Sequence, residues 1–365
     1  MSGSGSASPT ASGRDIIVIG FSAGGVDPLV RLVAEFPADL AAAVFIVHHF
    51  PAKSISALPH IVSRAGPLPA DHPQHGERVL PGRIYIAPPN RHMLLGEGRI
   101  HLTNGPREHG HRPAVDPLFR TAARVYGARV VGVLLSGTLD DGTEGLLAIK
   151  RHHGVTVVQD PAEALYPGMP NSAILEVGVD HVKPVERIGS LLVQLASQPV
   201  SHADQDSQLA PLDPPDPAAA GTRALAQEKP SGTPSGLTCP ECGGALWEAD
   251  EAGFLHYRCH VGHAYSEESM LVAQAQRLEA ALWAAVRSLE EKAELARHLA
   301  GRSRRRGLRR SADRFEQSVE EAERGSTELR RLLLRGVSGP PIAPEEAEIV
   351  GQADPESSAS GDRRR

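Results

Sequence analysis

The sequence predicts an α/β protein: a doubly wound, mostly parallel sheet with helices on both faces, followed by a small cysteine-containing module and a C-terminal helical hairpin. Three observations support this prediction. Short apolar runs alternate with helix-compatible stretches over residues 14–197, all three cysteines lie between residues 239 and 259, and a helical hydrophobic period follows them. A chain of 365 residues with 41% hydrophobic content has enough material for two or three folded units.

The apolar runs of the first half are typical of buried parallel strands. They are rich in Val and Ile and lack polar alternation, as expected when helices cover both faces of a sheet. The runs are DIIVIG (15–20), AAVFIVHH (42–49), RIYIAP (83–88), RVVGVLLSG (129–137) and VTVVQD (155–160).

The second half divides by composition. Residues 198–236 contain seven prolines and few large apolar side chains, which predicts a linker after a domain spanning 14–197. A module over 237–265 holds the cysteines, and helical spacing over 266–337 predicts a hairpin whose first helix is capped by Ser266 and broken at Gly301. Residues 1–13 and 338–365 are expected to be disordered tails.

Charge and hydropathy limit the partners. The formal net charge of −6 gives no general reason to expect nucleic acid, and the basic run 302–310 is interpreted as a solvated helix face. The longest apolar run, 40–47, is too short for a bilayer span, so we expect no membrane insertion. Without a secretory signal pattern, the expected location is cytoplasmic.

A candidate nucleophile, Ser22, follows the first strand in the sequence GFSAGG (20–25). In a G-x-S-x-G turn between strand and helix, glycines let the chain turn sharply and expose the serine at the carboxyl edge of the sheet. The alternative is a plain βα turn or a phosphate-binding loop.

The second strand ends in His48 and His49, and the strand over 129–137 is followed by Asp140 and Asp141. A serine needs a base, and the base needs a group that holds its tautomer. Three strand ends of one sheet offer these side chains, although the residues alone do not choose between the neighbouring histidines. The order Ser, His, Asp differs from that of standard α/β-hydrolases.

Several segments within residues 14–197 resemble the motifs of a known family. The segments IGFSAGG (19–25), HHFP (48–51), GERVLPGRIYIAPPNRHM (76–93), GHRPAVDPLF (110–119), LLSGTLDDGTEG (134–145) and GMPNSAI (168–174) resemble the catalytic domain of CheB-type protein-glutamate methylesterases. The resemblance assigns the nucleophile to Ser22, the base to His49 and the orienting acid to Asp141.

The resemblance implies hydrolysis of glutamyl methyl esters on methyl-accepting chemotaxis receptors, with glutamine deamidation as a second reaction and no cofactor for catalysis. It makes Arg112 and Thr138 candidate substrate-binding residues, with a histidine kinase or a separate regulator as a further partner. A solvated surface arginine is the alternative interpretation of Arg112.

The chain departs from the family pattern at Ala23, where Thr is usual, at Thr138-Leu139, where Met-Gly is usual, and at His48, where Gln is usual. About 14 residues precede the first strand, so we expect no phosphoacceptor receiver domain within the chain. These departures keep open a second hypothesis, that the protein is a catalytically altered adaptor or scaffold that binds receptor or kinase.

The cysteine module has the spacing C-x2-C-x16-C-x3-H, formed by Cys239, Cys242, Cys259 and His263. This pattern predicts one tetrahedral structural zinc, because the CPxC turn supplies two thiolates and CHVGH supplies a thiolate and an imidazole. His260 is an alternative fourth ligand, and a redox dithiol is the alternative function. The module resembles a C-terminal extension of some methylesterase homologues.

Overall fold

The computed structural model describes residues 13–49, 56–200, 232–251 and 254–335, in two compact units that divide after Glu267. Each unit is described by itself. Of the tails and linker predicted at 1–13, 198–236 and 338–365, residues 1–12, 201–231 and 338–365 lie outside the described residues. No described helix combines the length and the apolar character that a bilayer crossing requires.

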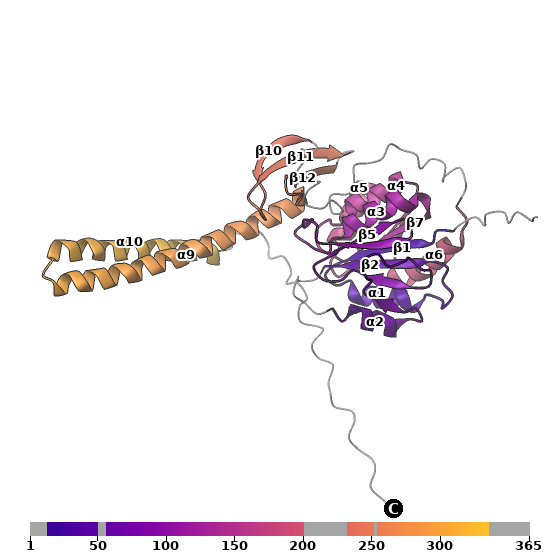
Figure 1. Cartoon of the computed structure of the whole chain (residues 1–365), viewed down its shortest axis with the longest axis horizontal. Coiled ribbons are helices and arrows are strands. Elements are labelled where there is room, and N and C mark those ends of the chain that lie inside the picture. The colour runs from indigo at the N-terminus through magenta and orange to yellow at the C-terminus, as the bar shows by residue number, and fades with distance from the viewer. Residues whose placement is uncertain (1–12, 50–55, 201–231, 252–253, 336–365) are drawn as a thin grey trace, which may run out of the picture. The chain divides into compact units, whose positions relative to one another are not determined.

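The first unit is built on a parallel sheet, as the sequence predicts (Figure 1). Among the described residues its strand order is β3-β4-β2-β1-β7-β8-β9, and every pairing is parallel. The strands are β1 (Ile16–Phe21), β2 (Ala43–His48), β3 (Ala70–Asp71), β4 (Ile84–Ile86), β7 (Val130–Leu134), β8 (Val155–Gln159) and β9 (His181–Lys183). From β1 the chain first adds β2, β3 and β4 on one side of β1, and it later adds β7, β8 and β9 on the other side. The strand order therefore reverses between β1 and β7.

Helices cover both faces of this sheet (Figure 1). Side chains of α1 (Val26–Ala34), α2 (Leu58–Ala65) and α6 (Val185–Ser197) form one buried layer with alternate residues of β1. The opposite layer contains α3 (Val115–Tyr126), α4 (Thr143–Arg151) and α5 (Gly168–Val177), together with the hairpin β5 (His92–Gly96) and β6 (Arg99–Thr103). A short 3₁₀ turn, Gly127–Arg129, leads from α3 into β7.

A smaller antiparallel sheet follows in the same unit. The described residues give it the order β10-β11-β12-β13, formed by Thr233–Thr238, Ala245–Glu251, Phe254–Cys259 and Ala264–Ser266. Strand β10 begins inside the range predicted as linker, since the extended segment TPSGLT pairs with β11. Two turns bring the predicted metal ligands to one end of this ribbon.

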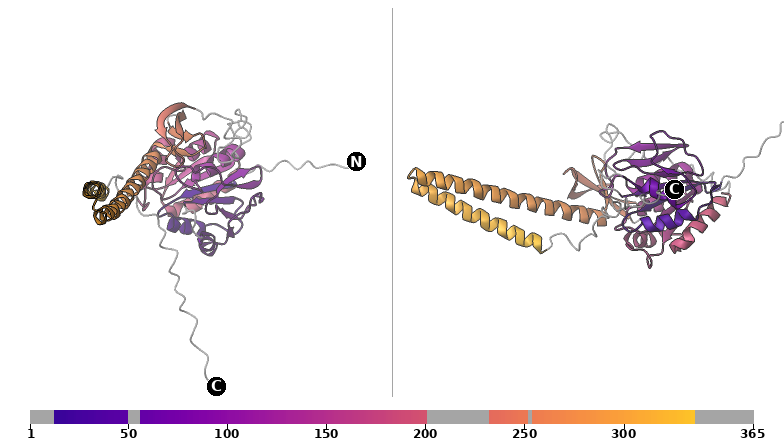
Figure 2. Two further views of the ribbon diagram at one scale, coloured as in Figure 1. Left: turned by 60° about the vertical axis from the view of Figure 1, so that its left-hand side comes forward. Right: turned by 90° about the horizontal axis from the view of Figure 1, so that it is seen from below.

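The second unit is the predicted helical hairpin, α9 (Glu267–Arg305) and α10 (Arg309–Leu334), drawn side by side in all views of Figures 1 and 2. The predicted break at Gly301 is wrong, because α9 continues through it. The chain reverses at Gly307, whose φ of +73° suits glycine. Gly301 lies inside α9, and since one glycine costs a helix only about 1 kcal/mol, it need not end the helix.

Candidate active site

Ser22 lies directly after β1, in the turn that leads into α1. The amide of Ser22 donates to the Ser136 carbonyl (3.0 Å), which ties this turn to the segment after β7. Gly24 has φ +71°, and a Cβ there would lie 2.8 Å from Leu165 Cβ and 2.9 Å from Ser136 Oγ. The glycine therefore meets both a conformational and a steric requirement of the turn.

The parallel register places His49 beside Ser22. Phe21 pairs with His48 across β1 and β2, so the next residue of each strand extends from the same sheet edge. The Nδ1 atom of His49 is 3.2 Å from Ser22 Oγ, and its Nε2 atom is 2.6 Å from Asp141 Oδ2. The structure thus brings Ser22, His49 and Asp141 into one hydrogen-bonded chain.

Asp141 is held as an acceptor by the start of α3. Its Oδ2 accepts from the Val115 amide (2.7 Å) and its Oδ1 accepts from the Asp116 amide (3.0 Å). An ionised carboxylate is favoured at a helix N-terminus because its oxygens receive otherwise unpaired N–H groups. With both backbone donors facing Asp141, His49 is the partner that donates through Nε2–H, which leaves Nδ1 free to accept from Ser22.

A buried histidine, His109, lies behind Asp141. Its Nε2 is 2.9 Å from Asp116 Oδ2 and 3.9 Å from Asp141 Oδ1, while Nδ1 is 3.9 Å from Asp140 Oδ1. Burial lowers the pKa of His109, but the hydrogen bond to Asp116 and the charges of the three carboxylates outweigh burial and raise this pKa to about 10. Burial, reinforced by the charge of Asp141, raises the pKa of Asp116. His109 is therefore a cation at neutral pH and offsets the acidic cluster from within.

The imidazole of His49 is in the opposite state. It is buried and stacks on His111, with ring centroids 3.8 Å apart and planes 1° from parallel. Burial, together with the charge of His109, lowers the pKa of His49 to about 3. Burial also lowers the pKa of His48, which stacks on Phe21, to about 3. His49 is consequently neutral near pH 7, the state that a general base needs.

Thr138 lies in the loop after β7 that approaches Ser22. A Cβ built on its neighbour Gly137 would lie 3.1 Å from Ser22 Cβ, so this backbone runs close to the nucleophile. The amides of Ala23 and Thr138 donate none of the hydrogen bonds formed among the described residues. Two N–H groups left unpaired among the described residues, in the two turns next to a nucleophile, suit an oxyanion.

Arg112 is anchored by its own hydrogen bonds. Its guanidinium donates to Asn90 Oδ1 (2.8 and 3.1 Å) and to the carbonyls of Asn104 and Gly105 (3.1 and 2.7 Å). All three acceptor atoms are uncharged, and among the described residues no carboxylate lies within hydrogen-bond distance of the guanidinium. The side chain is more ordered than a freely solvated surface arginine would be.

The four predicted metal ligands converge, and their donor atoms lie within 4.8 Å of one another. Cys242 Sγ is 3.7 Å from Cys259 Sγ, and His263 Nδ1 is 3.6 Å from Cys239 Sγ and 3.5 Å from Cys259 Sγ. A tetrahedron with Zn–S near 2.3 Å and Zn–N near 2.0 Å has edges of about 3.8 Å (S–S) and about 3.5 Å (S–N). The spacing fits a metal and is far longer than a disulfide bond.

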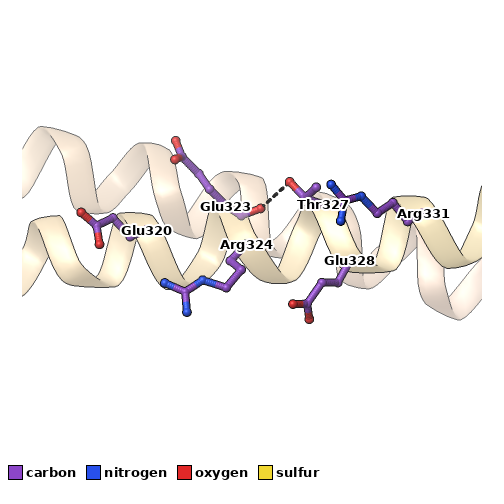
Figure 3. Close-up of a pocket in the computed structure, with 6 residues that line it drawn as sticks. All are labelled: Glu320, Glu323, Arg324, Thr327, Glu328 and Arg331. Atoms are coloured by element: carbon purple, nitrogen blue, oxygen red, sulfur yellow. Dashed lines mark hydrogen bonds between the residues drawn. The ribbon is translucent and has the colours of Figure 1, made fainter.

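The hairpin offers no comparable chemistry. A hollow on the surface of α10 is lined by Glu320, Glu323, Arg324, Thr327, Glu328 and Arg331. Figure 3 shows these side chains spread along the helix, with the Thr327 hydroxyl bonded to the Glu323 carbonyl. Alternating charges without a nucleophile or base are typical of a solvated helix face.

His109, Asp116 and the two amides that hold Asp141 were not predicted as site residues from the sequence. His111 was noted only as part of a motif, and no residue spacing indicates that its ring stacks on His49. The motif GHRPAVDPLF contains three of these positions and His109 directly precedes it, so a search for histidines next to the start of α3 could have found them.

Comparisons with known proteins show which family the first half of the chain is similar to. The family model for CheB methylesterase matches residues 17–192. A Leptospira interrogans relative named "Putative protein-glutamate methylesterase/protein-glutamine glutaminase" is 35% identical over 182 residues, which cover 50% of this chain and 94% of that relative. A Pyrococcus horikoshii protein-glutamate methylesterase/protein-glutamine glutaminase is 34% identical over 190 residues, 51% of this chain and 52% of the relative.

The chain spans about half the length of several curated relatives that it matches. Among solved structures, the catalytic domain of CheB methylesterase from Thermotoga maritima is 30% identical, with a TM-score of 0.48, over 51% of this chain and 100% of that domain. Because the family model covers the described parallel sheet and the chain spans almost all of the Leptospira relative, the chain belongs to the CheB methylesterase family.

Proposed function

We propose that the protein hydrolyses γ-glutamyl methyl esters of methyl-accepting chemotaxis receptors, and that the same site deamidates receptor glutamines. The observation that carries this proposal is the hydrogen-bonded series from Ser22 Oγ through His49 to Asp141 at the carboxyl edge of the sheet. Ser22 and Asp141 follow β1 and β7, the two strands between which the strand order reverses, and this is the usual place for a site in this class of fold. The intact series also speaks against the adaptor hypothesis.

In the proposed reaction, Ser22 Oγ attacks the ester carbonyl carbon while Nδ1 of His49 takes its proton. The tetrahedral oxyanion accepts hydrogen bonds from the free amides of Ala23 and Thr138. When the intermediate collapses, the proton on Nδ1 passes to the leaving methoxide and methanol departs. A water then attacks the glutamyl-serine ester with the help of the same nitrogen, and Ser22 is regenerated.

Asp141 acts through His49. It accepts Nε2–H throughout and stabilises the imidazolium that forms when Nδ1 is protonated. Because both carboxylate oxygens also accept backbone amides, the acid cannot turn away between steps.

Arg112 is proposed to attract the acidic face of a receptor helix. Within the described part of the chain its charge has no carboxylate partner at hydrogen-bond distance, and its position is set by Asn90 and two carbonyls. A histidine kinase or a separate regulator is the proposed partner for control of the activity.

We further propose that Cys239, Cys242, Cys259 and His263 hold a structural zinc. Three distances between the donor atoms match the edges of a zinc tetrahedron, all four atoms lie within 4.8 Å of one another, and four protein ligands leave no position for a substrate. Catalysis itself would need no cofactor. Cysteines bind a metal only when they are reduced, and thiols stay reduced in the cytoplasm, so the cytoplasm is the proposed location.

The test is methanol release from methylated receptor by Ser22→Ala, with Ser190→Ala, at an exposed position of α6, as the matched control. We expect Ser22→Ala to lose more than about 1000-fold in rate and Ser190→Ala to match the wild type, with both variants retaining the wild-type melting temperature. Wild-type methanol release by Ser22→Ala would refute the assignment.

A further inference from the structure

The cysteine ribbon is joined to the esterase by backbone pairing. The His109 amide donates to the Ala264 carbonyl (2.8 Å), and the Ala264 amide donates to the Arg107 carbonyl (3.3 Å). Glu108 and Ala264 form the parallel bridge between these bonds, and both are buried. Strand β13 of the ribbon therefore extends along the esterase segment 107–109.

A buried side-chain hydrogen bond adds to this contact. Ser266, the last residue of β13, donates its hydroxyl to Asp140 Oδ1 at 2.8 Å, with 2% and 5% of the two residues exposed. Asp140 directly precedes Asp141, the acid that receives Nε2–H of His49. The ribbon thus contacts the loop that carries the catalytic acid.

The two contacts reach the acid from different sides. The backbone of His109 is bonded to β13, while its side chain lies 3.9 Å from the carboxylates of both Asp140 and Asp141. A shift of β13 would therefore move His109 and release Asp140 together. Buried segments tied in this way move as a unit, because the core around them is close-packed.

Charges on the two parts are complementary as well. Arg107 of the esterase pairs with Glu241 of the CPxC turn (3.2 Å). The charge of Arg258 on β12 acts with Arg120 against the effect of burial and lowers the pKa of Glu108 to about 2. These charges favour one seating of the ribbon over others.

The proposed metal site is adjacent in sequence to the contact between β13 and segment 107–109. His263, a proposed ligand, immediately precedes Ala264, and the Cys259 amide donates to the His263 carbonyl (3.0 Å). In a ribbon of this size the metal supplies much of the folding free energy, so loss of the metal would loosen the turn from which β13 starts.

We infer that β13 and Ser266 position the catalytic acid, so that metal loading of the ribbon sets the reactivity of Ser22. This inference rests on the proposed function for the role of Ser22, His49 and Asp141. Ser266 is a positioning residue, because it reaches the relay through Asp140 and touches no reacting atom.

The test compares Ser266→Ala with Ser235→Ala in the full-length protein. Ser235 is the matched control, because its hydroxyl donates to the Leu246 carbonyl inside the ribbon. Three readouts are needed: kcat and KM for methanol release, the rate at which a fluorophosphonate labels Ser22, and hydrogen exchange of the His109 amide.

For Ser266→Ala we expect kcat and the labelling rate to fall about tenfold, since small displacements of catalytic groups are costly, with KM unchanged and faster exchange at His109. Ser235→Ala should match the wild type in all three. Equal labelling rates and equal His109 exchange in the two variants would overturn the inference.

Metal removal is the second arm. Stripping zinc with a chelator, with metal content measured independently, should slow labelling of Ser22 and speed exchange at His109, and added zinc should restore both. Unchanged labelling after complete stripping would overturn the metal coupling. If wild-type protein is labelled at Ser22 yet releases no methanol from receptors, the proposed substrate fails, while the coupling is still decided by the labelling rates.

Discussion

Replacing Asp141 with Asn tests the proposed relay with little change in shape. In the wild type, one oxygen of Asp141 accepts from the Val115 amide and from His49, and the other accepts from the Asp116 amide. Asparagine has one oxygen and one NH₂ group, so it cannot accept on both sides. In either orientation the NH₂ group of the asparagine faces an N–H group that also needs an acceptor.

The two orientations have different costs. If the NH₂ group faces Val115 and His49, it imposes the wrong tautomer, with the proton on Nδ1, and Ser22 loses its base. If it faces Asp116 instead, the tautomer survives but a buried N–H is left without an acceptor, which costs about 1–3 kcal/mol. Loss of the carboxylate in Ser-His-Asp triads lowers kcat by about 10⁴, equivalent to about 5 kcal/mol in the barrier.

We therefore expect Asp141→Asn to lower kcat for methanol release by about 10³–10⁴ and the free energy of unfolding by about 1–3 kcal/mol. Receptor methanol assays and urea unfolding measure the two quantities, with Asp180→Asn, a partly buried carboxylate remote from the relay, as the control for a carboxylate-to-amide change. A kcat within threefold of the wild type would show that Asp141 does not orient the base.

Three further outcomes are expected. Gly137→Ala should lower stability by about 1–3 kcal/mol and slow labelling of Ser22, because the new Cβ would lie 2.0 Å from Met169 Sδ; normal melting and labelling would contradict this packing. The pKa of His48 is about 3 in the folded protein, so the free energy of unfolding falls as pH drops below 6.5 and the unfolded chain takes up the proton first. Between pH 7 and pH 4, urea titrations should show a fall in this free energy that is up to about 3 kcal/mol smaller for His48→Gln than for the wild type. Cys242→Ser should lower bound zinc by more than about tenfold in metal analysis, and full zinc binding by this variant would exclude it as a ligand.

The parallel sheet was predictable because burial on both faces leaves a plain signal. The runs in β1, β2, β4, β7 and β8 are mostly apolar, and the structure confirms each as a strand of the sheet. Strands β3 and β9 were missed, since they span two and three residues and carry mostly polar or exposed side chains.

Contacts between distant segments left no such signal. Ser266 and Asp140 are 126 positions apart, and nothing in either local pattern indicates that they meet. The turn at Gly307 was also missed, because glycine at 301, 307 and 325 looks alike in sequence and only the packed hairpin selects the one with positive φ.

The orientation of the base follows from the strand order. Ser22 and His49 extend from adjacent strands at equal register, so the nearer ring nitrogen, Nδ1, faces the serine. Asp141 comes from the far side of β1, after β7, and only the more distant Nε2 reaches it. A relay whose members come from β1, β2 and β7 therefore needs the acid advanced beyond its strand end, and the amides of α3 together with the loop at Asp140 are the groups that hold it there.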